Sequence, residues 1–281
     1  MYRSSKVLKF SKPLQKKRKK LLNKALLISI CIIILIINLI FILRLPFFQI
    51  NAVISNVKYS EEIENKTLSL LKENYFYLIP KSNILFYPKR EIVDSLLNTY
   101  KSIESIQINK IDFNTINLNI VERSSVSIVC DGFHALGNND NCYYLDKNSF
   151  IYKKIENENE LINKIIYYND FENNQNIIGT KFLKESEFND LNDFLEALNT
   201  LNLDPKGILI GTDGEYEIYA KNTDDSDMII YFNNKEIMTN TISTFIAFWN
   251  NSRILKKGES KLPIFESINL RFGNNIFYVI K

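Results

Sequence analysis

The stretch from Ala25 to Leu43, ALLISICIIILIINLIFIL, constrains this chain more than any other. It contains no charge, proline or glycine, and Asn38 is its one strongly polar residue. A helix of this length rises about 28 Å, close to the ~30 Å hydrocarbon core of a bilayer. A soluble core helix normally keeps a polar stripe, and a signal peptide has a shorter apolar core followed by a small-residue cleavage site. Neither feature is present, which favours a retained transmembrane helix over residues 25–43.

Basic residues are concentrated before this helix. Residues 1–24 contain ten lysines and arginines and no acidic residue. The positive-inside rule therefore predicts that this tail is cytoplasmic and that everything after Leu43 lies outside the plasma membrane. The run Lys16–Lys20 has two interpretations, a nucleic-acid patch or a contact with anionic lipid headgroups, and its place beside a membrane helix favours the lipids. The chain after Arg44 has 24 basic and 32 acidic residues, a net charge of −8.

Residues 46–123 predict a first outer domain with the order β-α-α-β-β. Apolar residues alternate with polar ones from Phe48 to Ile54, which indicates a strand. A helix is expected from Ser60, as its N-cap, to about Glu73, and a second helix begins near Pro88. Two more strands are expected at 103–111 and 116–120.

Residues 124–281 predict a second, mostly antiparallel β domain with helices. Helical spacing of apolar residues indicates helices at about 186–198 and 235–250. Alternation and turn residues predict strands at 126–130, 142–145, 150–152, 207–211, 216–220, 228–232, 267–272 and 276–280. The expected fold class is therefore α+β, with a tail, one membrane helix and two outer domains.

The order of these segments resembles the FtsQ/DivIB family of bacterial cell division proteins, in which a POTRA domain follows a basic tail and a single anchor. FFQINAVISNV is similar to the family's membrane-exit strand, and IESIQINKIDFNTINLNIVERSSVSIV to the paired strands that close the POTRA domain. CYYLDKNSFIY resembles the first hairpin of the β domain, and INLRFGNNIFYVI its final hairpin. The resemblance covers nearly the whole chain and lies in the order of the stretches.

This resemblance implies a non-enzymatic scaffold at the division septum. It implies that the outer part binds FtsB/DivIC-type and FtsL-type partners and helps to control septal peptidoglycan synthesis. In the family, the partner adds a strand to the edge formed by the last strands of the β domain. The matching positions here are Arg271 and Phe272, followed by Phe277 and Tyr278. Without the resemblance, the same residues describe an ordinary edge hairpin with a solvated arginine.

Two of the three cysteines flank the loop CDGFHALGNNDNC, on strands that follow each other in sequence. Outside the membrane a disulfide between Cys130 and Cys142 is chemically allowed, and we expect it to form. Free thiols are the main alternative. A zinc site would use the same cysteines with His134, but it lacks a clear fourth ligand. Cys31 lies in the membrane helix, where we expect it to be inert.

Asp225-Ser226-Asp227 matches the Asp-x-Asp pattern of metal-dependent glycosyltransferases, which gives the rival hypothesis of a membrane-anchored enzyme. The segment falls between two predicted strands, however, and a charged turn explains it. A nucleotide-sugar domain would also need alternating parallel strands and helices. The chain has one histidine, which leaves little scope for metal or histidine-based catalysis, so no cofactor or metal is expected. A POTRA-type translocation receptor is a third possibility. The sequence shows no membrane barrel after the POTRA-like segment, which argues against this hypothesis.

Overall fold

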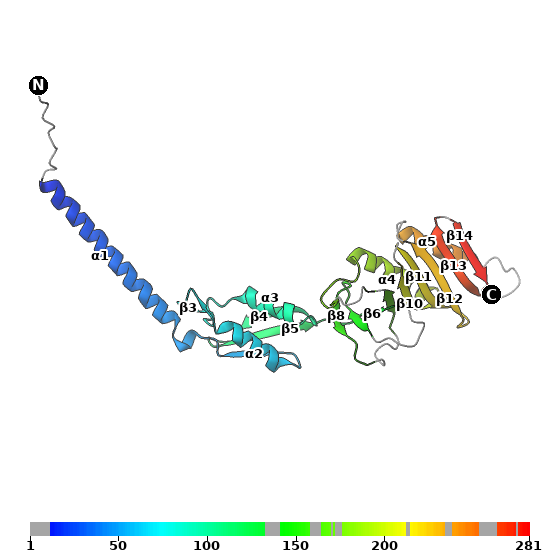
Figure 1. Cartoon of the computed structure of the whole chain (residues 1–281), viewed down its shortest axis with the longest axis horizontal. Helices are drawn as coiled ribbons and strands as arrows, with labels where there is room; N and C mark the ends of the chain where they lie inside the picture. Colours follow the sequence, from blue (N-terminus) through cyan, green and yellow to red (C-terminus); the bar gives the residue numbers. More distant parts are fainter. Residues whose placement is uncertain are drawn as a thin grey trace, which may run out of the picture. The chain divides into compact units, whose positions relative to one another are not determined.

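The computed structural model describes residues 12–132, 141–157, 164–169, 171, 176–211, 214–233, 238–252, 263–273 and 275–281. The chain forms an α+β protein that divides into two compact units (Figure 1). The first unit contains residues up to Tyr100 together with Ser105–Val121. The second contains Lys101–Glu104 and Glu122–Lys281. The division after Val121 lies close to the predicted domain boundary at residue 123.

Helix α1, Lys12–Leu43, opens the first unit (Figure 1, blue). Its part from Lys19 to Leu43 is long and apolar enough to cross a membrane, with a mean hydropathy of 3.4 and only 6% of its most apolar window buried. The side-chain amide of Asn38 donates a hydrogen bond to the carbonyl of Ile34 at 2.8 Å, so this bond stays within the helix. The helix starts earlier than residue 25 because the basic tail is rich in lysine and leucine, which are good helix formers.

Residues 46–122 have the predicted β-α-α-β-β order, with a short helical turn before it and a small hairpin between the two helices. The order is a 3₁₀ turn at Pro46–Phe48, β1 (Ala52–Ser55), α2 (Ser60–Leu71), β2 (Asn74–Tyr75), β3 (Ile79–Pro80), α3 (Lys89–Thr99), β4 (Ile103–Lys110) and β5 (Thr115–Glu122). The strands form a sheet in the order β1-β5-β4, in which β1 and β5 are parallel. The helices bury Ile63, Leu71, Ile92 and Leu96, and the sheet buries Val53, Ile108, Ile116 and Leu118.

Three details of this unit differ from the prediction. The first strand begins at Ala52 and not at Phe48, because Pro46 favours a short helical turn instead. Ser60 lies inside α2, and Tyr59 precedes the helix without a capping hydrogen bond. The segment expected to be a simple turn is a small hairpin of β2 and β3.

The end of α1 is bonded directly to this unit. Asn83 and Gln49 both donate side-chain hydrogen bonds to the carbonyl of Leu43, at 2.8 and 3.0 Å. Arg44 donates to the carbonyls of Leu78 at 2.9 Å and Tyr77 at 3.0 Å. These bonds satisfy the last carbonyl of the helix and join the helix to the β2–β3 hairpin, and we call this arrangement the helix–domain joint.

The second unit is built on a nine-stranded sheet in the order β14-β13-β12-β11-β10-β9-β6-β7-β8. Its strands are β6 (Ser127–Asp131), β7 (Cys142–Leu145), β8 (Ile151–Lys154), β9 (Ile166–Asn169), β10 (Asp204–Ile210), β11 (Glu215–Lys221), β12 (Asp227–Asn233), β13 (Phe265–Phe272) and β14 (Asn275–Ile280). The pairs β6–β9, β9–β10 and β12–β13 are parallel and the other five are antiparallel. The sheet is therefore mixed, with antiparallel pairs in the majority as predicted.

Helices α4 (Glu185–Thr200) and α5 (Met238–Ser252) bury their apolar residues in one large core with the sheet. Phe194 of α4 lies edge-on to Phe232 of β12, with ring centroids 5.2 Å apart. Trp249 of α5 is 1% exposed and lies 5.5 Å from the ring of Phe265 in β13. The opposite face of the sheet has a second, smaller cluster formed by Ile128, Cys130, Cys142 and Tyr168.

Candidate partner-binding edge of the C-terminal sheet

Strand β14 lies at one end of the nine-stranded sheet, and in the described parts of the chain no strand covers its other side (Figure 1, red). It pairs antiparallel with β13, from Phe265 opposite Ile280 to Phe272 opposite Asn275. The register shifts twice along the pair, and each time the extra residue is on β13. Strand β14 itself is therefore regular over its six residues.

The alternation of an antiparallel ladder shows which backbone groups of β14 are free. The N–H of Lys281 donates to the carbonyl of Ile264 at 3.0 Å, so residue 281 faces β13. Because alternate residues face opposite sides, residues 275, 277 and 279 also face β13. The N–H and carbonyl groups of Ile276, Tyr278 and Ile280 then point away from the sheet, where an added strand would bond to them.

The side chains of this edge are apolar and exposed. Phe272 is 55% exposed and Phe277 is 59% exposed, and their rings meet edge-on with centroids 5.2 Å apart. Val279 and Ile280 are each 50% exposed, and the strand sequence NIFYVI has no charge. Natural edge strands usually carry a charge, a proline or a cover that blocks pairing. This edge has an apolar surface instead, which suits a partner that covers it.

Tyr278, unlike Phe272 and Phe277, has its ring against aromatic residues of the core. Its ring contacts Phe248 of α5 at 5.3 Å and Phe265 of β13 at 5.6 Å, both centroid distances. The side chain is still 45% exposed. Tyr278 therefore helps to hold β14 on the core through its side chain, while its backbone faces the free side.

Arg271 was expected to be solvated or to await a carboxylate on a partner, and the structure gives it partners within the chain. Its guanidinium lies 2.7 Å from the carboxylate of Glu215 in β11 and 5.2 Å from the ring centre of Tyr231 in β12. Its Nε also donates to the side-chain oxygen of Asn269 at 3.2 Å. Burial raises the pKa of the Tyr231 phenol, with the charge of Glu217 adding to the effect. The side chain of Arg271 thus has contacts with residues of β11, β12 and β13.

The sequence did not predict the role of Asn222, whose side chain holds β13 through two hydrogen bonds to its backbone. Its amide nitrogen donates to the carbonyl of Phe265 at 2.8 Å, and its amide oxygen accepts from the N–H of the same residue at 3.3 Å. The side chain is 5% exposed. The segment Asn222–Asp227 reads as an ordinary turn, and nothing local indicates that one of its amides binds a strand more than 40 residues later.

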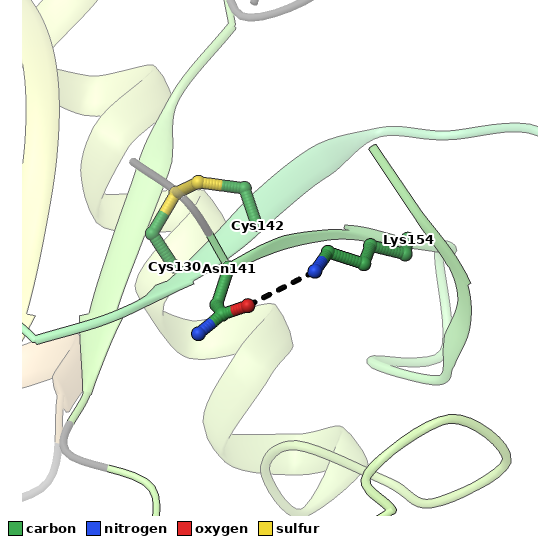
Figure 2. Close-up of a disulfide and its surroundings, with 4 residues drawn as sticks. All are labelled: Cys130, Asn141, Cys142 and Lys154. Atoms are coloured by element: carbon green, nitrogen blue, oxygen red, sulfur yellow. Dashed lines mark hydrogen bonds between the residues drawn. A yellow bond between two sulfur atoms is a disulfide. The ribbon is translucent and has the colours of Figure 1, made fainter. Parts of the chain in front are cut away.

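The structure joins Cys130 and Cys142 in a disulfide across the directly opposed pair of β6 and β7 (Figure 2). Their α-carbons are 4.1 Å apart, and both side chains are buried. Beside the disulfide, Lys154 donates to the side-chain oxygen of Asn141 at 3.0 Å and ties β8 to the same loop (Figure 2). His134, the third ligand of the zinc alternative, lies outside the described residues. Among the described residues no group of three histidines, cysteines or acids could hold a metal ion.

The Asp-x-Asp segment lies in the hairpin between β11 and β12. Asp225 has a left-handed backbone, with φ of 66°, and its N–H donates to the carbonyl of Asn222. Asp227 is paired in register with Lys221, whose ammonium lies 2.7 Å from its carboxylate. That contact lowers the pKa of Asp227 and raises the pKa of Lys221. The turn accounts for the backbone conformation of Asp225, and the ion pair with Lys221 accounts for the carboxylate of Asp227.

No protein-family model matches the chain, and no curated protein is significantly similar to it in sequence. The features of the chain that bear on function are therefore its fold and the free edge at β14.

Proposed function

We propose that the chain is a non-enzymatic, single-pass membrane scaffold of the bacterial division machinery, of the FtsQ/DivIB type. In this proposal the tail is cytoplasmic, α1 crosses the plasma membrane, and both outer units lie on the far side. The basic tail, the apolar helix, the β-α-α-β-β unit that suits a POTRA domain, and the C-terminal sheet support it by their order. The proposed location is the division septum.

The observation that carries the proposal is the uncharged, exposed free edge at β14. A partner of the FtsB/DivIC type, with an FtsL-type protein, would dock by adding a strand to this edge. Main-chain bonds to residues 276, 278 and 280 would supply affinity, and Phe272 and Phe277 would supply apolar contacts for specificity. Arg271 would contribute by joining β13 to β11 through its ion pair with Glu215. A carboxylate of the partner could bind Arg271 only if the guanidinium divides its N–H donors between that carboxylate and Glu215.

Two substitutions at one position test the docking mode. Ile280→Pro removes an N–H that faces the free side, while Ile280→Ala removes the same side chain and keeps that N–H. We expect pull-down of the FtsB/DivIC-type partner from detergent extracts to fail or weaken at least tenfold with proline and to persist with alanine. Thermal unfolding of both variants checks that the sheet is intact. Equal recovery of the partner by two folded variants would rule out strand addition at β14.

The cellular role is tested separately by depletion of the protein. A scaffold for septal peptidoglycan synthesis should give filamentous cells whose septa fail to form. Growth with normal division after depletion would overturn the division role, whatever the binding result.

A further inference from the structure

The first unit exposes a group of aromatic and large apolar side chains beside the end of α1. We call this group the juxtamembrane surface, and its members are Phe47, Phe76, Tyr77, Leu78, Leu85 and Phe86. Phe76 is 90% exposed and Tyr77 is 91% exposed, the highest values among the exposed large hydrophobic residues of the described chain. The other four are between 50% and 56% exposed.

Hydrogen bonds bring these side chains to one place. Arg44, the first residue after the apolar stretch, bonds to the carbonyls of Tyr77 and Leu78. The N–H of Ile84 donates to the carbonyl of Phe48 at 2.9 Å, which holds the segment that carries Leu85 and Phe86 against the helix exit. Tyr77 and Leu78 therefore lie within reach of the arginine that ends the apolar helix, and Leu85 and Phe86 follow a residue bonded to Phe48.

The turn at the tip of the β2–β3 hairpin breaks a local rule. The N–H of Leu78 donates to the carbonyl of Tyr75 at 2.9 Å, and the two residues between them, Phe76 and Tyr77, have φ of 49° and 60°. Two positive φ angles in such a turn favour asparagine and glycine, and bulky residues there are strained. Two almost fully exposed aromatic residues at these positions do not stabilise the fold in water. Their presence therefore indicates a function at the tip of the hairpin.

We propose that the juxtamembrane surface enters the headgroup region of the same membrane that α1 crosses, so that the first unit rests on the lipid. Aromatic residues are enriched at this depth because their rings are amphipathic. The surface adjoins the end of the proposed membrane helix, and this position favours the bilayer interface as its occupant. This inference rests on the membrane anchor proposed above and is independent of the division role.

The test uses the full chain reconstituted in vesicles of phosphatidylcholine and phosphatidylglycerol. Its one native tryptophan, Trp249, is buried in the second unit and provides a constant background. Phe76→Trp places a probe at the hairpin tip. Tyr59→Trp is the matched control. Tyr59 is an aromatic residue of the same unit, is 73% exposed, and comes after β1, the strand that leads away from the helix–domain joint. Lipids with a nitroxide high on the acyl chain act as the quencher.

We expect the Phe76→Trp probe to be quenched at least threefold more than the control and to emit at a shorter wavelength. Equal quenching of both probes, or none, in vesicles that retain the protein after carbonate washing would overturn the lipid contact alone. Loss of the protein in the carbonate wash would instead overturn the anchor. The two failures are therefore distinguishable.

A second variant shows whether the aromatic residues serve the turn or the lipid. Replacing Phe76 and Tyr77 by asparagine and glycine supplies the pair that this turn favours. With Phe86→Trp as the probe, we expect the replacement to reduce lipid quenching severalfold and to leave thermal unfolding unchanged or raised. Unchanged quenching together with a lower unfolding temperature would assign these aromatic residues to the fold and refute the proposal.

Discussion

Reduction of the disulfide between Cys130 and Cys142 should destabilise the second unit by an amount set by its loop. The two cysteines are 12 positions apart, and both are buried beside Ile128 and Tyr168. In the chain-entropy model, opening a loop of this size gives the unfolded chain freedom worth about 3 kcal/mol. The reduced sulfurs keep nearly the same volume, so little packing is lost with the bond.

The fluorescence of Trp249 reports this unit alone, because it is the single tryptophan and lies in the core of the second unit. The assay is urea unfolding of the full chain in detergent, oxidised and reduced, with Cys31→Ala to remove the third thiol. With a slope of about 2 kcal/mol per molar urea, the expected loss lowers the midpoint by about 1.5 M. The variant with alanine at both 130 and 142 should behave like the reduced chain.

Two results would refute this reasoning. Oxidised, folded protein in which both cysteines react with an alkylating agent would show that the bond is not made. A reduced chain with free thiols and an unchanged midpoint would show that the loop constrains nothing, or that the end of the sheet with β6 and β7 unfolds separately from the core around Trp249.

Three further predictions follow from contacts in the outer units and from the tail. Arg123→Met should cost about 3–5 kcal/mol by the same fluorescence assay, because it leaves the 3% exposed carboxylate of Asp146 without its buried cation; a loss below 1 kcal/mol would contradict this. The carboxyl of Asp227 should titrate below its ordinary pKa in a ¹³C-NMR titration and return towards it in Lys221→Met. The small stabilisation from that pair is present at neutral pH and is lost as the pH falls through the lowered pKa, and identical titration curves would argue against the pair. A reporter fused after Lys281 should be active only outside the cytoplasm, and cytoplasmic activity would reverse the topology.

Sequence patterns predicted the local structure well where each element carries its own periodicity. In β11 and β12, buried residues alternate with outer ones, and the predicted strands at 216–220 and 228–232 lie inside the observed ones. The two strands of the last hairpin, expected at 267–272 and 276–280, likewise lie inside β13 and β14. The α+β class followed from the same patterns.

Non-local pairing could not be predicted in the same way. Strand β9 was missed, although it lies between β6 and β10 and is parallel to both. The strand is short, Ile166–Asn169, and both of its neighbours are distant in sequence; it packs so closely on β10 that a Cβ at Gly207 would meet the ring of Tyr168 at 2.9 Å. Glu215, the partner of Arg271, is 56 positions away in sequence and two strands away in the sheet. A single sequence contains no signal for such a contact.

The helix–domain joint has a mechanical consequence. A flexible linker would let a membrane helix rotate or tilt without moving the domain it carries. Here Asn83 and Gln49 bond to the last carbonyl of the helix, and Arg44 bonds to the adjacent hairpin, so hydrogen bonds couple the end of α1 to the residues that follow it. In the membrane topology proposed above, a torque applied to α1 by a neighbouring helix would therefore be transmitted to the β2–β3 hairpin, without any ligand crossing the bilayer.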